Sequence, residues 1–259
     1  KLIKYIKSRY NPLEVIVVSS VKNYNIDYLF DILRQYKKKN IYVVGTTNGG
    51  KSTLIKLLLK ELEPTSGKIY VNNRYINKLS RKKLPMLRRD IGVVFQDFKL
   101  FPFSIRENII LDQRENVKML QKLYEVYGVE TIIKKLSEGD RTNLDKKFDS
   151  KGTELSGGEK QEIAITRAFY KEPTWVILDE PSSALDAKAE ETLYKQVISQ
   201  EQKAGLFFVS HRLSSCKLCD VILVMRGGEI IERGDHVSLM DKKGEYYQLF
   251  TTQAEMYKM

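Results

Sequence analysis

Short apolar runs recur along the chain, and polar segments separate them. The runs are Glu14–Val18, Ile41–Val44, Ile91–Phe95, Trp175–Leu178, Leu206–Val209 and Val221–Met225. Continuous apolar runs of this length are typical of strands buried on both faces of a parallel sheet. The pattern therefore predicts a sheet whose strands are mostly parallel.

Helical patterns fill most of the gaps between these runs. Apolar residues at helical spacing begin at Ile26, with Lys37–Lys39 in the last turn, and Lys188–Gln202 follows the same pattern. From Ile105 to Ser150 the pattern is helical and polar, with no strong strand. We expect an α/β fold in which helices flank a mostly parallel sheet, with residues 105–150 as an inserted helical subdomain.

Length and composition favour one globular domain over residues 1–259. The chain has 259 residues and 42% hydrophobic content, enough to bury a full core. No apolar run approaches the roughly 18 residues that a membrane-spanning helix needs, and Lys1–Arg9 lacks the pattern of a signal peptide. These features predict a soluble, cytoplasmic chain.

The formal net charge of +11 raises the question of nucleic-acid binding. The basic residues are dispersed in pairs and triplets, such as Arg81–Lys83 and Arg88–Arg89, which is typical of solvated faces. We expect no direct nucleic-acid binding. Attraction to an anionic lipid surface is an alternative of the same weight as nucleic-acid binding. Cys216 and Cys219 have CxxC spacing without a second pair, so we interpret them as ordinary thiols.

A glycine-rich segment joins the apolar run Ile41–Val44 to a helical pattern at Thr53–Leu62. A strand, a glycine-rich loop with Lys and Ser, and a helix form the arrangement that binds phosphates, because backbone N–H groups and the helix N-terminus face the anion. Lys51 is expected at the β- and γ-phosphates, and Ser52 at Mg²⁺. The predicted nucleotide-binding residues of this loop are Gly45, Thr46, Thr47, Asn48, Gly49, Gly50, Lys51, Ser52 and Thr53.

Two adjacent carboxylates, Asp179 and Glu180, follow the run Trp175–Leu178. Open α/β sheets bind ligands at the carboxyl ends of their strands, so both acids are expected near the phosphates. We predict that Asp179 holds Mg²⁺ through its water shell and that Glu180 is the general base for the attacking water.

From about Pro64 onward, the chain resembles the nucleotide-binding domain of an ATP-binding cassette (ABC) transporter. Leu155–Glu159 resembles the signature motif, Gln96 with Asp97–Pro102 the Q-loop, Ser183–Asp186 the D-loop, and His211 the switch histidine. Within the family, Ile105–Ile109 and the chain end resemble exporters.

The resemblance implies a P-loop NTPase that hydrolyses Mg-ATP for transmembrane domains at the cytoplasmic face of a membrane. It further implies a head-to-tail homodimer in which Ser156, Gly157 and Gly158 contact the γ-phosphate bound by the other copy. His211 and Gln96 would act with Glu180 in catalysis, and Gln96 would also approach the metal.

The first sixty residues resemble a different P-loop family, the circularly permuted GTPases of ribosome assembly. The order strand, helix, strand before the phosphate loop carries this likeness, with Ser19–Lys22 as a guanine-contacting loop. We interpret the chain as an engineered chimera joined near Leu57–Pro64; a diverged natural transporter domain is the alternative. Residues 1–60 would be GTPase-like, 61–104 and 151–259 the ABC-like core, and 105–150 the helical subdomain.

The sequence predicts poor selectivity for the base of the nucleotide. No Asn-Lys-x-Asp element is present, and the candidate stacking rings Tyr24 and Tyr42 stand away from the position that the ABC pattern requires. We expect ATP and GTP to bind with similar strength. Three functions stay open: an exporter ATPase, a designed chimera that binds nucleotide with little turnover, and a ribosome-associated GTPase.

Overall fold

The computed structural model describes residues 40–45, 49–64, 69–71, 74–111, 113–145, 152–181, 187–199 and 204–256. Several predicted features lie outside these residues. They are the strand Glu14–Val18, the helix from Ile26, the loop residues Thr46, Thr47 and Asn48, the ring of Tyr24, and the D-loop Ser183–Asp186.

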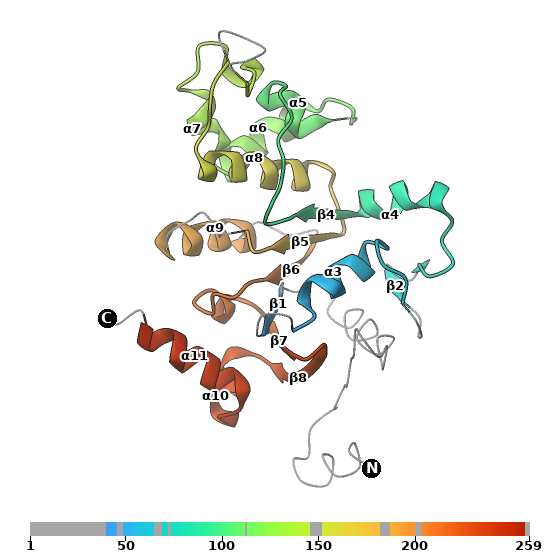
Figure 1. Cartoon of the computed structure of the whole chain (residues 1–259). Coiled ribbons are helices and arrows are strands. Elements are labelled where there is room, and N and C mark those ends of the chain that lie inside the picture. Colours follow the sequence, from blue (N-terminus) through green and yellow to red (C-terminus); the bar gives the residue numbers. More distant parts are fainter. Residues whose placement is uncertain are drawn as a thin grey trace. The chain divides into compact units, whose positions relative to one another are not determined.

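The chain divides into two compact units (Figure 1), and each is described by itself. Unit 1 comprises Lys1–Leu84 and His211–Met259, and unit 2 comprises Pro85–Ser210. The strands of unit 1 are β1 (Asn40–Gly45), β2 (Tyr70–Val71), β3 (Arg74–Tyr75), β7 (Val221–Arg226) and β8 (Glu229–Gly234), and its helices are α3 (Lys51–Leu58), α10 (His236–Lys242) and α11 (Glu245–Met256). Unit 2 holds β4 (Ile91–Val94), β5 (Trp175–Asp179) and β6 (Gly205–Val209), with α5 (Ile105–Ile110), α6 (Val117–Val126), α7 (Val129–Ile133), α8 (Gly157–Tyr170) and α9 (Ala187–Ser199); α4 (Leu84–Asp90) begins at the boundary.

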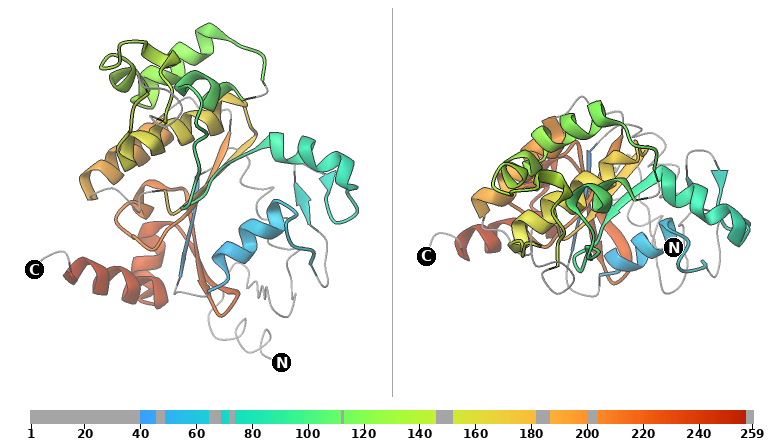
Figure 2. Two further views of the ribbon diagram at one scale, coloured as in Figure 1. Left: turned by 45° about the horizontal axis from the view of Figure 1, so that its top comes forward. Right: turned by 90° about the horizontal axis from the view of Figure 1, so that it is seen from above.

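In unit 1, the two most apolar strands pair in parallel. β1 and β7 lie side by side from Ile41 opposite Val221 to Gly45 opposite Met225. The antiparallel strand β8 then pairs with β7 after a tight turn at Gly227 and Gly228. The C-terminal helices α10 and α11 contact each other, and α10 contacts β8 (Figure 2).

In unit 2, three parallel strands lie in the order β4, β5, β6. Val94 lies opposite Leu178, and Asp179 lies opposite Val209, so the three strands end along one edge. Four helices, α5 to α8, form a separate subdomain beside these strands (Figure 1). Its core residues are Ile105, Ile109, Leu120, Tyr124, Val129, Ile132, Leu155, Ile163 and Tyr170.

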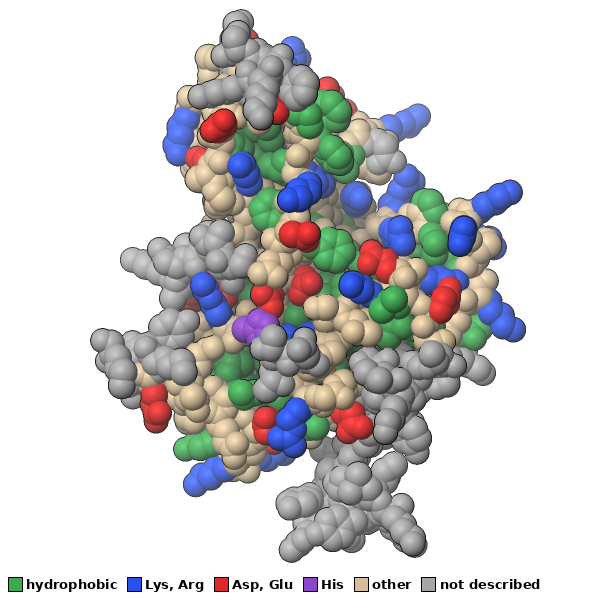
Figure 3. All heavy atoms as spheres, in the orientation of Figure 1, with side chains coloured by type: hydrophobic (Ala, Val, Ile, Leu, Met, Phe, Trp, Pro, Cys, Tyr) green, Lys and Arg blue, Asp and Glu red, His purple; other side chains and the backbone are tan. Residues whose placement is uncertain are grey.

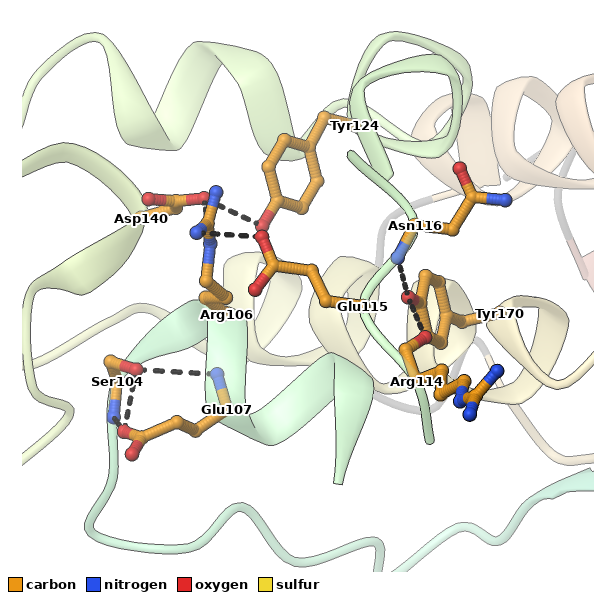
Figure 4. Close-up of polar contacts among 9 residues, drawn as sticks. All are labelled: Ser104, Arg106, Glu107, Arg114, Glu115, Asn116, Tyr124, Asp140 and Tyr170. Atoms are coloured by element: carbon orange, nitrogen blue, oxygen red, sulfur yellow. Dashed lines mark hydrogen bonds and ion pairs between the residues drawn. The ribbon is translucent and has the colours of Figure 1, made fainter. Parts of the chain in front are cut away.

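A polar network ties together the subdomain's helices and loops (Figure 4). The Arg106 guanidinium contacts the carboxylates of Asp140 at 2.9 Å and Glu115 at 3.0 Å, and the Tyr124 hydroxyl donates to Asp140. Tyr170 is buried, and its hydroxyl accepts from the backbone of Asn116 while donating to the carbonyl of Arg114. These contacts join α5, α6 and α8 to the connecting loops.

The mixed α/β fold with mostly parallel strands is confirmed, as are all predicted strands within the described residues. Three strands were not predicted: β2 and β3 are only two residues long, and β8 is a half-buried antiparallel strand. The helix after the phosphate loop begins at Lys51, two residues before the predicted start, and ends near Leu58. On the face that Figure 3 shows, acidic side chains lie among the basic ones in both units.

Candidate functional site

Close backbone approach fixes the beginning of the phosphate loop. Gly45 is the last residue of β1 and has φ +152°, and a Cβ added there would lie 2.0 Å from the Met225 carbonyl oxygen. Further along the loop, the carbonyl of Gly49 accepts a hydrogen bond of 3.0 Å from the backbone N–H of Gly228. The loop is therefore held against β7 and the β7–β8 turn by main-chain contacts that leave no room for a side chain at Gly45.

The first turn of α3 follows directly. Gly50 is its N-cap, with φ +96°, and no side chain among the described residues caps the helix there. The first turn also carries no acidic residue. The helix dipole therefore favours an anion at this end.

The ammonium of Lys51 lies over the same loop. Its Nζ donates to the carbonyl oxygen of Gly45 at 2.8 Å, and the residue is only 5% exposed. A buried ammonium needs oxygen partners, and a phosphate could supply them here. Ser52 is exposed in the first helical turn and Thr53 is half-buried.

In unit 2, three predicted residues lie along one sheet edge. Gln96 lies in the turn that follows β4, Asp179 ends β5, and Glu180 comes next. Because β4 and β5 are parallel neighbours, these amide and carboxyl groups share the carboxyl edge of the sheet. They are oxygen donors of the kind that Mg²⁺ prefers.

The backbone at Glu180 has an unusual conformation. Its φ is +48°, in the left-handed region that residues with a side chain rarely adopt, and its N–H donates to the Val209 carbonyl at 2.7 Å. Such a conformation costs on the order of 1–3 kcal/mol and is frequent at functional sites. The buried residue Pro181 follows directly.

The loop after Gln96 is braced by two residues that the sequence analysis did not single out. The Asn108 amide is fully buried and bonds the backbone of Phe101, Phe103 and Ser104. Arg167, on α8, donates to the carbonyl of Lys99 and to Asn108. Asn108 lies within the exporter-like segment Ile105–Ile109, which was the only sequence signal for it.

The predicted signature residues begin helix α8. The Ser156 hydroxyl accepts from the N–H of Glu159 at 3.3 Å, and the Glu159 carboxylate accepts from the Ser156 N–H at 2.9 Å, which forms a capping box. The hydrogen bonds that the Ser156 N–H and hydroxyl donate to the Glu159 carboxylate, with lesser help from Lys135, lower the pKa of Glu159. Gly157 is exposed and Gly158 half-buried in the first turn.

His211 lies in unit 1, at the start of a turn outside regular structure, and its side chain is exposed. Tyr42, one of the two candidate stacking rings, is fully buried in β1, and its hydroxyl donates to the Arg212 carbonyl, so this ring belongs to the core. His236 is not a surface turn residue, since it begins α10 and packs against Tyr246 and Phe250.

The two cysteines are free thiols, as expected, and both are buried. Burial raises the pKa of Cys216 to about 11, which disfavours the thiolate that metal binding requires. The two cysteine side chains therefore contribute to packing.

The predicted residues thus form three groups. Unit 1 holds the phosphate loop and His211; unit 2 holds Gln96, Asp179 and Glu180 at one sheet edge, and Ser156–Gly158 at the start of α8. Within the described residues, no helix is both long and apolar enough to cross a bilayer.

Comparisons with known proteins identify the family of the chain. The family model described as "ABC transporter" matches residues 33–183, more than half of the chain. The match begins upstream of the phosphate loop, inside the segment that the sequence analysis assigned to a GTPase-like origin. The chain is 36% identical over 222 residues to "Multidrug resistance protein 1" of Entamoeba histolytica, covering 84% of this chain and 16% of that protein.

It is also 34% identical over 218 residues to the "Probable multidrug resistance ABC transporter ATP-binding/permease protein YheH" of Bacillus subtilis, covering 84% of this chain and 31% of that protein. Among solved structures, it is similar to the "Structure of a bacterial Atm1-family ABC exporter with ATP bound", with a TM-score of 0.74 and 28% identity, covering 84% of this chain and 37% of that one. The chain therefore spans well under half the length of these relatives.

Proposed function

Since the chain belongs to the ABC transporter family, we propose that it is the nucleotide-binding domain of an exporter and hydrolyses Mg-ATP to drive transport. The observation that carries the proposal is the geometry of the phosphate loop. Its glycine backbone is packed against β7, its helix begins without a side-chain cap, and the Lys51 ammonium lies at 2.8 Å from the Gly45 carbonyl. The helix N-terminus and the ammonium both favour a negative charge here, which suits a polyphosphate.

Glu180 is the general base in this proposal. Its backbone N–H is bonded to the Val209 carbonyl at the sheet edge, and its carboxylate would accept a proton from the attacking water. His211 would contact the γ-phosphate, and Gln96 would help to place the water and the metal. Removing the proton during attack raises the nucleophilicity of the water oxygen, which then displaces the ADP leaving group.

The donor set fits magnesium. Ser52 offers a hydroxyl, Asp179 a carboxylate and Gln96 an amide oxygen, all hard ligands. Bound there with ATP, Mg²⁺ would neutralise charge on the phosphates. Asp179 would hold it through water, and Ser52 would hold it directly.

The second nucleotide contact would come from another copy in a head-to-tail dimer. In the capping box, the Ser156 hydroxyl also donates to the Glu159 carboxylate at 3.0 Å, so this donor is already used. The N–H groups of Gly157 and Gly158 are the donors left for a γ-phosphate, and the hydroxyl would join them by turning away from Glu159. The dimer therefore requires a rearrangement within the first turn of α8.

The partner domains would be membrane-spanning. YheH is named as an ATP-binding/permease protein, and the chain spans 31% of it, so we place the chain at the cytoplasmic face beside transmembrane domains. Residues 105–150 would act as the helical subdomain between residues 61–104 and 151–259 of the core. The GTPase-like origin of residues 1–60, and a chimera with reduced turnover, stay predictions from the sequence.

Base selectivity should be weak. Tyr42 is buried beneath Arg212 and cannot stack on a base, so affinity would rest on the phosphates and Mg²⁺. We expect ATP and GTP affinities to agree within about tenfold, ~1.4 kcal/mol. Competition binding of the two nucleotides measures this directly.

Steady-state hydrolysis of Mg-ATP against protein concentration tests the proposal. The parent should show turnover per chain that rises with concentration, Glu180→Gln should lose at least about a hundredfold, and Glu125→Gln, an exposed acid on α6, should match the parent. A concentration-independent monomer with negligible turnover would instead favour a structural chimera. GTP hydrolysis coupled to salt-sensitive RNA binding would favour the ribosome-associated GTPase.

A further inference from the structure

The turn that carries His211 has little structure of its own. His211, Arg212 and Leu213 follow the β6 region without forming a helix or a strand, so their backbone groups need partners from elsewhere. The position of the exposed imidazole depends on this backbone. The elements that hold the turn therefore decide where the imidazole lies.

One side chain of the C-terminal helix bonds the turn at two places. Gln253, on α11, donates from Nε2 to the carbonyl oxygen of His211 at 2.8 Å, and its Oε1 accepts from the backbone N–H of Leu213. A carbonyl requires a donor and an N–H requires an acceptor, so both ends of the amide are specified. The two bonds flank Arg212, whose carbonyl accepts from the Tyr42 hydroxyl.

Helix α11 is itself held in place by hydrogen bonds, so the position of the Gln253 amide is well defined. Glu232 of β8 accepts from the first two N–H groups of α11, those of Glu245 and Tyr246, at 2.8 Å each. The fully buried Tyr246 hydroxyl lies 2.8 Å from both the Cys216 thiol and the His236 imidazole. Gln253 follows Tyr246 by two helical turns, which places both on the same side of α11.

We propose that Gln253 is a positioning residue for His211: its amide holds the backbone on both sides of Arg212 and so sets where the imidazole meets the γ-phosphate. The proposal rests on the proposed ATP hydrolysis. It links catalysis to the last helix of the chain, more than forty residues beyond the histidine. Gln253 touches no reacting atom in this role and acts only through the turn.

Two replacements separate the hydrogen bonds from packing. Gln253→Met keeps the length of the side chain but removes both bonds, whereas Gln253→Glu keeps the acceptor for Leu213 and removes the donor to His211. Gln248→Ala, an exposed residue on the same helix, is the matched control. Thermal unfolding of each variant shows whether it folds.

We expect kcat for ATP to fall about tenfold in Gln253→Met and at least as far in Gln253→Glu, while nucleotide affinity stays within about twofold. The NMR signal of the His211 imidazole, assigned with His211→Ala, should move in both variants, and that of His236 should not. Gln248→Ala should match the parent in every measurement. Parent-like kcat with an unmoved His211 signal would overturn the proposal, and so would an equal loss of affinity and turnover, since positioning acts on the chemical step.

Hydrogen exchange at the Leu213 amide separates this proposal from the proposed function. A parent without turnover, but with Leu213 protection that is lost in Gln253→Met, would reject ATP hydrolysis and leave the hydrogen bonds to the turn established. Unchanged protection in Gln253→Met would reject the bonds themselves, whatever the turnover of the parent.

Discussion

Two helices begin at predicted nucleotide contacts, and they begin in opposite ways. Helix α3 starts at Gly50 with a left-handed backbone, no side-chain cap among the described residues and no acid in its first turn. Helix α8 starts at Ser156 with a complete capping box and Glu159 in its first turn. The start of α3 carries no negative charge of its own, whereas the start of α8 already satisfies part of its donor capacity with its own side chains.

The difference indicates how each helix end is stabilised without nucleotide. At α3, main-chain contacts from β7 and the β7–β8 turn hold the loop, so the helix needs no cap of its own. At α8, the capping box of Ser156 and Glu159 stabilises the first turn. We therefore expect changes at α3 to depend on backbone space and charge, and changes at α8 to resemble ordinary helix capping.

The largest effect should follow Gly45→Ala. The new Cβ would lie 2.0 Å from the Met225 carbonyl oxygen, so β1 and β7 would have to separate where they pair. We expect the free energy of unfolding in urea to fall by about 3 kcal/mol or more. Gly227→Ala is the control: it has φ +60° but nothing within 4 Å, so its loss should be only about 1 kcal/mol. Equal losses would show that backbone space at β7 does not hold the loop.

Next comes Lys51→Met. Removing the ammonium should weaken ATP binding by about a hundredfold, ~2.7 kcal/mol, because a charge-assisted hydrogen bond to phosphate is lost. Isothermal titration calorimetry measures this. Lys56→Met changes an exposed lysine on the same helix and should bind ATP like the parent. Similar affinity in both variants would contradict a phosphate role for the Lys51 ammonium.

The sequence indicated the start of α3 to within two residues. Strand, glycine loop, lysine and serine are adjacent in the chain, so their order alone indicates how β1 leads into α3. The spacing of Ser156 and Glu159, three residues apart, is also that of a capping box at the start of α8. That the Ser156 hydroxyl donates to Glu159 depends on side-chain geometry, which no sequence pattern specifies.

Contacts across long stretches of sequence could not be predicted. Asn108 and Arg167 brace the loop after Gln96 from two different helices, and Gln253 reaches the His211 turn from the end of the chain. Tyr42 shows the same limit, because an aromatic residue in a strand can serve a ligand or the core, and only its burial decides.

Ser156→Ala should have a smaller effect, a loss of about 1 kcal/mol in the free energy of unfolding, which is typical of an N-cap. Ser104→Ala, in the matching box at α5 (Figure 4), should cost about the same, yet only Ser156→Ala should also reduce ATP turnover.

Since the pKa of Glu159 is lowered on folding, the contribution of its carboxylate to the free energy of unfolding is present above the ordinary value of 4.5 and is lost as the pH falls through the folded value. The cost of Ser156→Ala, measured by urea unfolding, should therefore shrink in acid. A cost that does not change with pH would contradict the role of the Glu159 carboxylate.

The smallest effect on the free energy of unfolding is expected for Glu162→Gln, and its pH dependence should be opposite to that of Glu159 on the same helix. It lies one turn after Glu159, beside Gly128, and burial together with the Glu159 charge raises its pKa to about 7. A raised acid pKa destabilises the folded state as the pH rises from the ordinary 4.5 to about 7, the opposite of Glu159. Glu162→Gln should therefore stabilise the protein at about pH 8 by roughly 1 kcal/mol, after allowing for solvent screening of a half-buried group, and should have no effect at about pH 4. Glu125→Gln, which changes an exposed acid on α6, should leave the pH profile of urea unfolding unaltered. If Glu162→Gln behaved like this control, the Glu162 carboxylate would be solvated in the folded state. Its pKa would then not be raised, and of these two acids only Glu159, in the first turn of α8, would have a shifted pKa.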